Sequence, residues 1–573
     1  MIKKKTFTKN FMRVMAVSMA VMTLFACTGK EVAEDDNEHH PLYNYYTAGP
    51  SMTMSSCASM SAAATTSSAS SANAANASPT AVPPSYQKYG GAAFGYGTYD
   101  FDEEFNTEEY DALKENPFKD VSLSPLSTFS ADVDTASYAN IRRFIYSNYI
   151  PETIPQGAVR IEEMVNYFNY DYDGPKKGEP FGVNAEISTC PWNKDHQLVR
   201  IGLQTEKIDY KAADDSNIVL LIDVSGSMYS YNKLPLVQES FCMMVDNLSK
   251  KDRVSIVTYA SGNETVLEGV SGADKDTIKE AINSLTAYGG TNGAGGIEEA
   301  YRIAKENFIK DGNNRVIIAT DGDFNLGITS ASELSELIKE KAEEGIFLSV
   351  LGYGMGNYSD SRLETLADDG NGNYAYIDSP SEAKKVLVEE FGANMVTVAK
   401  DVKLQVEFNP AYVKEYRLLG YEDRMLNTED FDDDTKDAGE IGAGHSVTVL
   451  YEIVPAKNTF EGAGLKYQTS SLTDTAKNSD EWLTLKIRYK APAGDVSNLL
   501  EYSIGKKDVT SNPSDDFMFA AAVAEFGMIL RRSEYVNGKD FKHVKRVLKT
   551  LDLDDDYRKE LADMVEVCIE NSQ

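Results

Sequence analysis

The chain has 573 residues, 42% hydrophobic and 25% charged, which is typical of globular protein and long enough for several domains. Acidic residues number 89 against 56 basic ones, so the formal net charge is −33. This balance argues against nucleic acid as a partner, because binding phosphate requires clustered Lys and Arg. It suits solubility and the binding of divalent cations.

The first residues have the pattern of an export signal. MIKKKTFTKNFMR carries five basic residues and no acid, and VMAVSMAVMTLFA is an apolar run too short to span a bilayer comfortably. The run ends in LFAC, Leu24 to Cys27, which resembles the bacterial lipoprotein box. The resemblance implies removal of residues 1–26 and acylation of Cys27; an ordinary signal peptide followed by a cysteine is the alternative. No later apolar run has transmembrane length, so we expect a lipid-anchored protein of the cell envelope, at the outer membrane and facing the periplasm or the surface.

Residues 27–115 are predicted to form a tether. Their composition is dominated by Ser, Ala, Tyr and Gly without hydrophobic periodicity, as in SMTMSSCASMSAAATTSSASSANAANASPTAVPPS. Such sequence cannot bury enough apolar surface to fold. We therefore expect the folded part to stand away from its lipid.

Residues 116–210 are predicted to form a flanking region of helices and strands. Asp134 or Thr135 can cap a first helix, and a second begins at Val159. Two runs with partial period-two alternation, 181–192 and 196–208, are predicted strands.

Residues 211–397 have an α/β pattern. Apolar runs rich in Val, Ile and Leu alternate with amphipathic segments, which predicts a parallel sheet covered on both faces. The expected strands are 218–223, 253–260, 315–323, 346–354 and 373–378, with a shorter edge strand at 264–270; the expected helices are 234–248, 276–285, 293–308, 332–345, 362–370 and 381–391.

Residues 398–573 change character again. Alternating runs at 401–408, 414–421, 445–456 and 481–492 predict half-buried antiparallel strands, and helices are expected at 517–532 and 554–572. We expect the strands at 181–208 and 398–490 to form one β-sandwich into which the α/β domain is inserted. The predicted fold class is thus α/β, a doubly wound, mainly parallel sheet with a flanking β-sandwich and helical segments.

Polar side chains follow three of the predicted elements in the α/β domain. LLIDVSGSM places Asp223, Ser225 and Ser227 after the first strand, GGTN places Thr291 in a Gly-rich loop, and TDGD places Asp321 after a later strand. In open α/β sheets, ligands bind at the carboxyl ends of the strands. The sequence therefore predicts two carboxylates and three hydroxyls at one rim.

This set, DVSGSM with GGTN and TDGD, resembles the metal-ion-dependent adhesion site of von Willebrand factor type A domains, whose fold is Rossmann-like. The resemblance implies that Ser225, Ser227 and Thr291 bind the metal directly, and that Asp223 and Asp321 act through water, with Asp223 orienting the serines. The resemblance extends beyond the motif, over roughly residues 115 to 570, as in GGTNGAGGIEEAYRIA and VEFNPAYVKEYRLLGYEDRML. Over this range the chain resembles a bacterial family of type A domain proteins that carry an N-terminal flank and a C-terminal domain of unknown function.

The chemistry of the site favours Mg²⁺ or Mn²⁺. Oxygen ligands with few charges suit these octahedral ions, whereas Ca²⁺ prefers more ligands and ranks lower. The resemblance implies that one coordination position is left for an Asp or Glu carboxylate of a protein partner.

Three functions follow as hypotheses. The first is a binding module that captures an acidic residue through the metal, with no nucleic acid involved. The second is a structural lipoprotein in which the α/β domain is a scaffold. The third, a metal-dependent hydrolase, ranks last, because the chain has no G-x-S-x-G, no H-E-x-x-H and no readable Cys/His pair, so we expect no enzyme. The alternative without metal binding is that the motif is a solvated turn whose serine caps the following helix.

Overall fold

The computed structural model describes residues 108–572 apart from 209–214, 311, 323–330, 357, 437, 458–459, 461, 463, 468–470, 493, 495, 537 and 539. Cys27 and most of the predicted tether lie outside these residues. The tether was predicted to end at residue 115, but residues 108–115 already belong to the folded part, so this boundary is wrong. Glu108 is ion-paired with Arg143 and Glu115 with Arg417. Buried guanidinium groups need such carboxylate partners, which holds this segment in place.

The α/β domain is built on a six-stranded sheet in the order β10-β9-β8-β5-β6-β7. β7 lies at the edge, as expected for 264–270, and is antiparallel to β6, whereas all other neighbours are parallel. The predicted doubly wound, mainly parallel sheet is confirmed. The strands are β5 (Ser216–Asp223), β6 (Arg253–Tyr259), β7 (Asn263–Ser271), β8 (Asn313–Thr320), β9 (Ile346–Tyr353) and β10 (Tyr374–Ile377).

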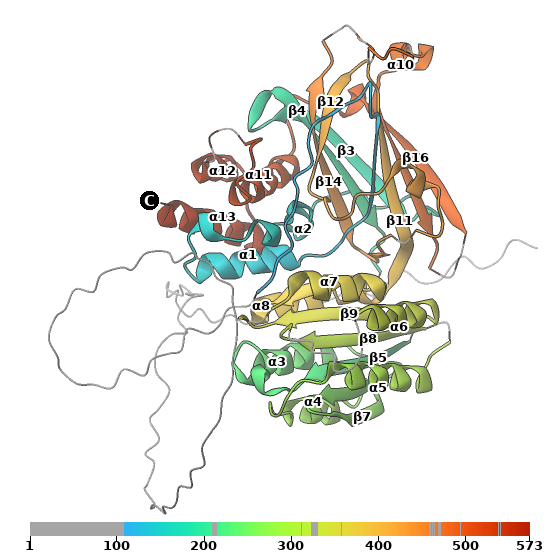
Figure 1. Ribbon diagram of the computed structural model, residues 1–573, viewed down its shortest axis with the longest axis vertical. Helices are drawn as coiled ribbons and strands as arrows, with labels where there is room; N and C mark the ends of the chain where they lie inside the picture. The colour runs from blue at the N-terminus through green and yellow to red at the C-terminus, as the bar shows by residue number, and fades with distance from the viewer. Residues whose placement is uncertain are drawn as a thin grey trace, which may run out of the picture. The chain divides into compact units, whose positions relative to one another are not determined.

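Helices cover both faces of this sheet, because its central strands are apolar on both sides. Leu220 packs into one core with α3 and α4, while Leu221 packs into a second core with α5, α6 and α7 (Figure 1). The helices are α3 (Leu234–Val245), α4 (Lys275–Asn283), α5 (Gly293–Glu306), α6 (Ala331–Glu343), α7 (Asp360–Asp369), α8 (Pro380–Lys384), the π-helix η5 (Lys385–Glu389) and α9 (Phe391–Met395).

Two further sheets pack around one apolar core and form the expected β-sandwich. One has the order β1-β12-β14-β4-β3, and the other has the order β13-β11-β15-β16 with β2 paired to β11. The first comprises β1 (Lys119–Asp120), β12 (Val413–Leu419), β14 (Ser446–Pro455), β4 (Asn193–Thr205) and β3 (Phe181–Cys190). The second comprises β13 (Ile441–Gly442), β11 (Thr397–Phe408), β15 (Glu481–Lys490), β16 (Ser497–Gly505) and β2 (Leu126–Ser130).

Five helices from the two flanks form a third core with the outer face of the first sandwich sheet (Figure 1). Leu198, Leu419 and Leu450 of the sheet pack into this core. The second helix, predicted to begin at Val159, begins at Ile161. The helices are α1 (Ala136–Tyr146), α2 (Ile161–Asn166), α11 (Asp515–Leu530), α12 (Phe541–Leu548) and α13 (Asp556–Asn571).

The remaining short helices lie in connections. They are η1 (Pro151–Thr153), η2 (Gln156–Ala158), η4 (Gly226–Tyr229), η6 (Thr428–Phe431), α10 (Asp474–Asn478) and η7 (Lys506–Asp508). No helix among the described residues is both long and apolar enough to cross a membrane.

Candidate metal centre

The carboxylate of Asp223 holds together the first loop of the site. Asp223 is the last residue of β5 and is fully buried. Its Oδ1 accepts a hydrogen bond from the backbone N–H of Ser225 (2.8 Å), and its Oδ2 accepts one from Thr320 Oγ1 (3.3 Å). The side chain therefore fixes the serine loop and ties it to the end of β8.

The two serine hydroxyls converge. Ser225 is buried and Ser227 is exposed on η4, and their Oγ atoms are 3.0 Å apart. Neighbouring oxygens around an octahedral ion with bonds of about 2.0–2.1 Å are about 3 Å apart. The separation of the hydroxyls thus fits two adjacent ligands of Mg²⁺ or Mn²⁺.

The Gly-rich loop brings Thr291 to the same rim. Gly226 donates from its backbone N–H to the carbonyl oxygen of Gly289 (3.1 Å), and Asn292 donates to that of Ala260 (2.7 Å). Gly289 has φ +80°, which favours glycine, and a Cβ there would lie 2.7 Å from Ser261 Oγ. The loop is therefore held against the residue between the two serines.

Asp321 lies at the end of β8 and has a basic partner. Its side chain is fully buried, and its Oδ2 accepts a hydrogen bond of 2.9 Å from Lys233 Nζ. Lys233 is itself buried, immediately before α3. The sequence analysis missed this lysine, and the only available signal was a lone basic residue in the loop that follows the serines.

Burial dominates the electrostatics of the site. It raises the pKa of Asp223 to about 6, with a further rise from the negative charge of Asp321 and an opposing effect of the hydrogen bonds from Ser225. Because the charge of Asp321 acts on buried Asp223, a cation beside the two carboxylates would be stabilised there.

Comparison with known proteins decides the family. Residues 217–390 match the family described as von Willebrand factor type A domain, residues 104–200 match one described as von Willebrand factor, and residues 393–570 match one described as the C-terminal region of uncharacterized protein YfbK. The chain is 43% identical over 447 residues to the uncharacterized protein YfbK of Escherichia coli (strain K12), and the alignment covers 77% of each chain. The chain belongs to the YfbK family of von Willebrand factor type A domain proteins.

Solved structures similar to this YfbK-family chain are more distant. A von Willebrand factor type A protein from Catenulispora acidiphila is 16% identical, with a TM-score of 0.39, over 70% of this chain and 91% of its own. Proximal thread matrix protein 1 from the mussel byssus, in a structure described as having a zinc-occupied MIDAS motif, is 24% identical, with a TM-score of 0.27, over 33% of this chain and 46% of its own.

The structure of this YfbK-family chain brings the five predicted site residues to one edge of the sheet. Among the residues that the structure describes, no group of three His, Cys, Asp or Glu side chains is placed to hold a metal. Type A domains commonly bind a divalent metal at this motif. The residues that would hold it are Asp223, Ser225, Ser227, Thr291 and Asp321, and their assignment as ligands stays a prediction.

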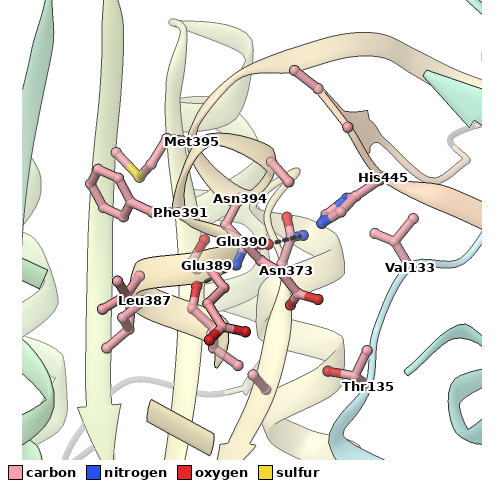
Figure 2. A pocket seen from close by; sticks show the side chains of 18 of the residues that line it. Val133, Thr135, Asn373, Leu387, Glu389, Glu390, Phe391, Asn394, Met395 and His445 are labelled. Carbon is pink, nitrogen blue, oxygen red and sulfur yellow. Dashed lines mark hydrogen bonds between the residues drawn. The ribbon is translucent and has the colours of Figure 1, made fainter. Parts of the chain in front are cut away.

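A separate cavity of about 540 Å³ lies between the α/β domain and the flanks, and none of the five site residues lines it. Figure 2 shows His445 pointing toward Asn373 and Asn394, whose side chains are hydrogen-bonded to each other (3.2 Å). Within the described part of the chain, Nδ1 of His445 is buried without a hydrogen-bonding partner. Burial lowers the pKa of this imidazole to about 4, so it is neutral at pH 7.

Proposed function

We propose that the protein is a lipid-anchored protein of the cell envelope that captures an acidic residue of a protein partner through a divalent metal. The metal, Mg²⁺ or Mn²⁺, would be held by Ser225, Ser227 and Thr291 directly and by Asp223 and Asp321 through water. It would supply a positive charge with one open coordination position for a carboxylate oxygen.

The observation that supports this proposal most is the 3.0 Å separation of the Ser225 and Ser227 hydroxyl oxygens beside two buried carboxylates. An acid of the partner would otherwise be repelled by a chain of net charge −33. A bound cation offsets that repulsion at one point, which gives the interaction its selectivity for a carboxylate.

The proposed anchoring rests on the sequence of the first 27 residues. Basic residues, a short apolar run and LFAC at Leu24 to Cys27 favour cleavage before Cys27 and its acylation. Mass spectrometry of the mature N-terminus from membranes tests this. A mature chain that keeps residues 1–26, or that begins without a lipid, would refute the anchor.

The metal step is tested by titration calorimetry of the full chain with Mg²⁺, Mn²⁺ and Ca²⁺, beside Asp223→Ala. We expect saturable binding of Mg²⁺ or Mn²⁺ that the variant loses. The capture step is tested by retention of envelope proteins on the immobilised chain with Mg²⁺ and with EDTA. Retention of the same partners with Mg²⁺ and with EDTA would refute the proposal.

A scaffold function is the second candidate, and ion pairs between the α/β domain and its flanks favour it. Arg142 of α1 is ion-paired with Asp378 and Glu382 of the α/β domain and with Glu560 of α13. Arg424 is ion-paired across the same boundary with Glu364 (2.9 Å) and Asp368 (2.5 Å). The α/β domain is thus firmly joined to both flanks. Cells carrying Asp223→Ala that keep every phenotype of the parent would favour this function over metal-dependent capture.

A further inference from the structure

The described chain begins beside the loop that follows β9. Glu108 accepts hydrogen bonds from Arg143 Nη1 (2.8 Å) and from the backbone N–H of Gly356 (2.9 Å). Glu109 forms a parallel bridge with Ser359 and donates its N–H to the carbonyl oxygen of Tyr358 (3.1 Å). The two segments run in the same direction because the bridge is parallel. Moving from Glu109 toward the N-terminus therefore follows the loop from Ser359 back toward Met355.

The same loop contacts the metal centre. Gly354, at φ +78°, packs so closely on Lys233 that a Cβ there would lie 2.4 Å from Lys233 Cε. Lys233 Nζ in turn donates to Asp321 Oδ2 (2.9 Å). Gly356 is two residues from Gly354, and Gly354 is joined to Asp321 through the side chain of Lys233. At about 3.5 Å per residue, this path places Gly356 within about 15 Å of the Asp321 carboxylate.

Exposed apolar side chains border the metal centre. Tyr229 is on η4 with Ser227 and is 83% exposed, while Tyr288, whose N–H donates to Val224, is 57% exposed. Met355, on the loop next to Glu108, is 40% exposed. Each of the three belongs to a loop that contacts the metal centre, and large apolar side chains this exposed offer contacts for another segment.

The ten residues that precede Glu108 match this surface chemically. They are TYDFDEEFNT, in which Tyr99, Phe101 and Phe105 alternate with acids at 100 and 102–104. We propose that residues 98–107 of this same chain dock on the surface made by Tyr229, Tyr288 and Met355 and present a carboxylate to the metal centre as a built-in ligand. The inference rests on the proposed function, because the carboxylate needs the metal.

The length of the segment is sufficient. Glu104 is four residues before Glu108 and Asp100 is eight residues before it. At about 3.3–3.6 Å per residue these acids reach roughly 13–29 Å from Glu108, which spans the distance to Asp321.

Charge makes the docking depend on the metal. The buried carboxylates of Asp223 and Asp321 disfavour the approach of another acid, and Lys233 is ion-paired with Asp321 alone of these two. A divalent cation adds two positive charges at this point and binds a carboxylate oxygen directly. A partner's acidic residue then competes with the chain's own segment, so that the segment sets a threshold for capture.

Hydrogen exchange followed by mass spectrometry on the full chain tests the inference, with saturating Mg²⁺ and with EDTA. We expect Mg²⁺ to slow exchange of residues 98–107 at least about tenfold, while residues 28–38 are unchanged. The combined variant Asp100→Asn, Asp102→Asn, Glu103→Gln and Glu104→Gln loses the slowing. The matched control, Glu31→Gln, Glu34→Gln, Asp35→Asn and Asp36→Asn, removes the same charge farther upstream and keeps it.

Calorimetry on the same samples separates this inference from the proposed function. If Mg²⁺ binds and residues 98–107 exchange at the same rate with and without it, the built-in ligand is refuted while the metal centre stands. If Mg²⁺ does not bind, both fail. Slowing that grows with protein concentration would assign the surface to a second copy of the chain and overturn docking within one chain.

Discussion

Lys233 Nζ lies 2.9 Å from Asp321 Oδ2, and both side chains are buried. The lysine belongs to the loop after the serines and the aspartate to the end of β8, so the ion pair joins two of the loops that form the metal centre. A cation of the protein thus stabilises one of the two carboxylates in the metal-free state. We therefore expect this internal competitor to lower the affinity of the site for a divalent ion.

Replacing Lys233 by methionine should therefore make the protein more dependent on metal. Removing one partner of a buried ion pair costs about 3–5 kcal/mol, because the other charge is left uncompensated. We expect Lys233→Met to melt earlier than the parent in EDTA and to gain more from saturating Mg²⁺. Thermal melts with and without Mg²⁺ measure both effects. Lys250→Met, at an exposed position, is the control and should behave like the parent.

Replacing Ser227 by alanine should weaken metal binding without unfolding the protein. Ser227 is exposed, so the free energy of unfolding should change by less than about 0.5 kcal/mol. Loss of one oxygen ligand should lower Mg²⁺ affinity at least tenfold, about 1.4 kcal/mol, in calorimetry. Ser230→Ala, on the same exposed loop, should leave affinity unchanged. Equal affinity in the two variants would remove Ser227 from the ligand set.

The strands of the α/β domain were predictable because each is a local apolar run, and the order of DVSGSM, GGTN and TDGD placed the loops. Lys233 was not, because its contact with Asp321 joins residues 88 apart and no spacing marks it. β1 was missed for a similar reason, because it has two residues and depends on tertiary packing. α12 (FKHVKRVL) does carry a local signal that the sequence analysis overlooked, since Phe541, Val544 and Leu548 recur at helical spacing.

His445 should make the stability of the fold fall at acid pH. Burial lowers its pKa to about 4, against a smaller opposing effect of Glu390 and alongside the positive charge of Lys385. Between pH 6.5 and 4 the unfolded chain binds a proton there that the folded chain does not bind. The free energy of unfolding therefore falls as the pH drops through this window, by about 1–3 kcal/mol from this group.

His445→Gln tests this contribution by denaturant unfolding at pH 7 and pH 4.5. The variant should lose less stability than the parent over that interval. His40→Gln removes a histidine from the N-terminal low-complexity region and should keep the slope of the parent. If His445→Gln and the parent lose the same amount, the imidazole is protonated in the folded state.

Gly202 of β4 should tolerate no larger side chain, because the ring of Tyr172 packs directly against it. Along β4, Val199, Ile201 and Leu203 face the sandwich core, while Leu198 faces the helices. Gly202 shares that second face, where a Cβ would lie 2.3 Å from Tyr172 Cζ. The buried ring cannot easily move, since its hydroxyl is hydrogen-bonded to Thr448 Oγ1 (2.9 Å).

Gly202→Ala should cost about 1–3 kcal/mol in denaturant unfolding. Gly174→Ala, with open space around its Cβ, should change stability by less than about 0.5 kcal/mol. Both variants should still bind Mg²⁺ when folded, because β4 and the metal centre belong to different sheets. Equal stability of the two variants would mean that the helices pack on this face less tightly than the contact of Tyr172 with Gly202 implies.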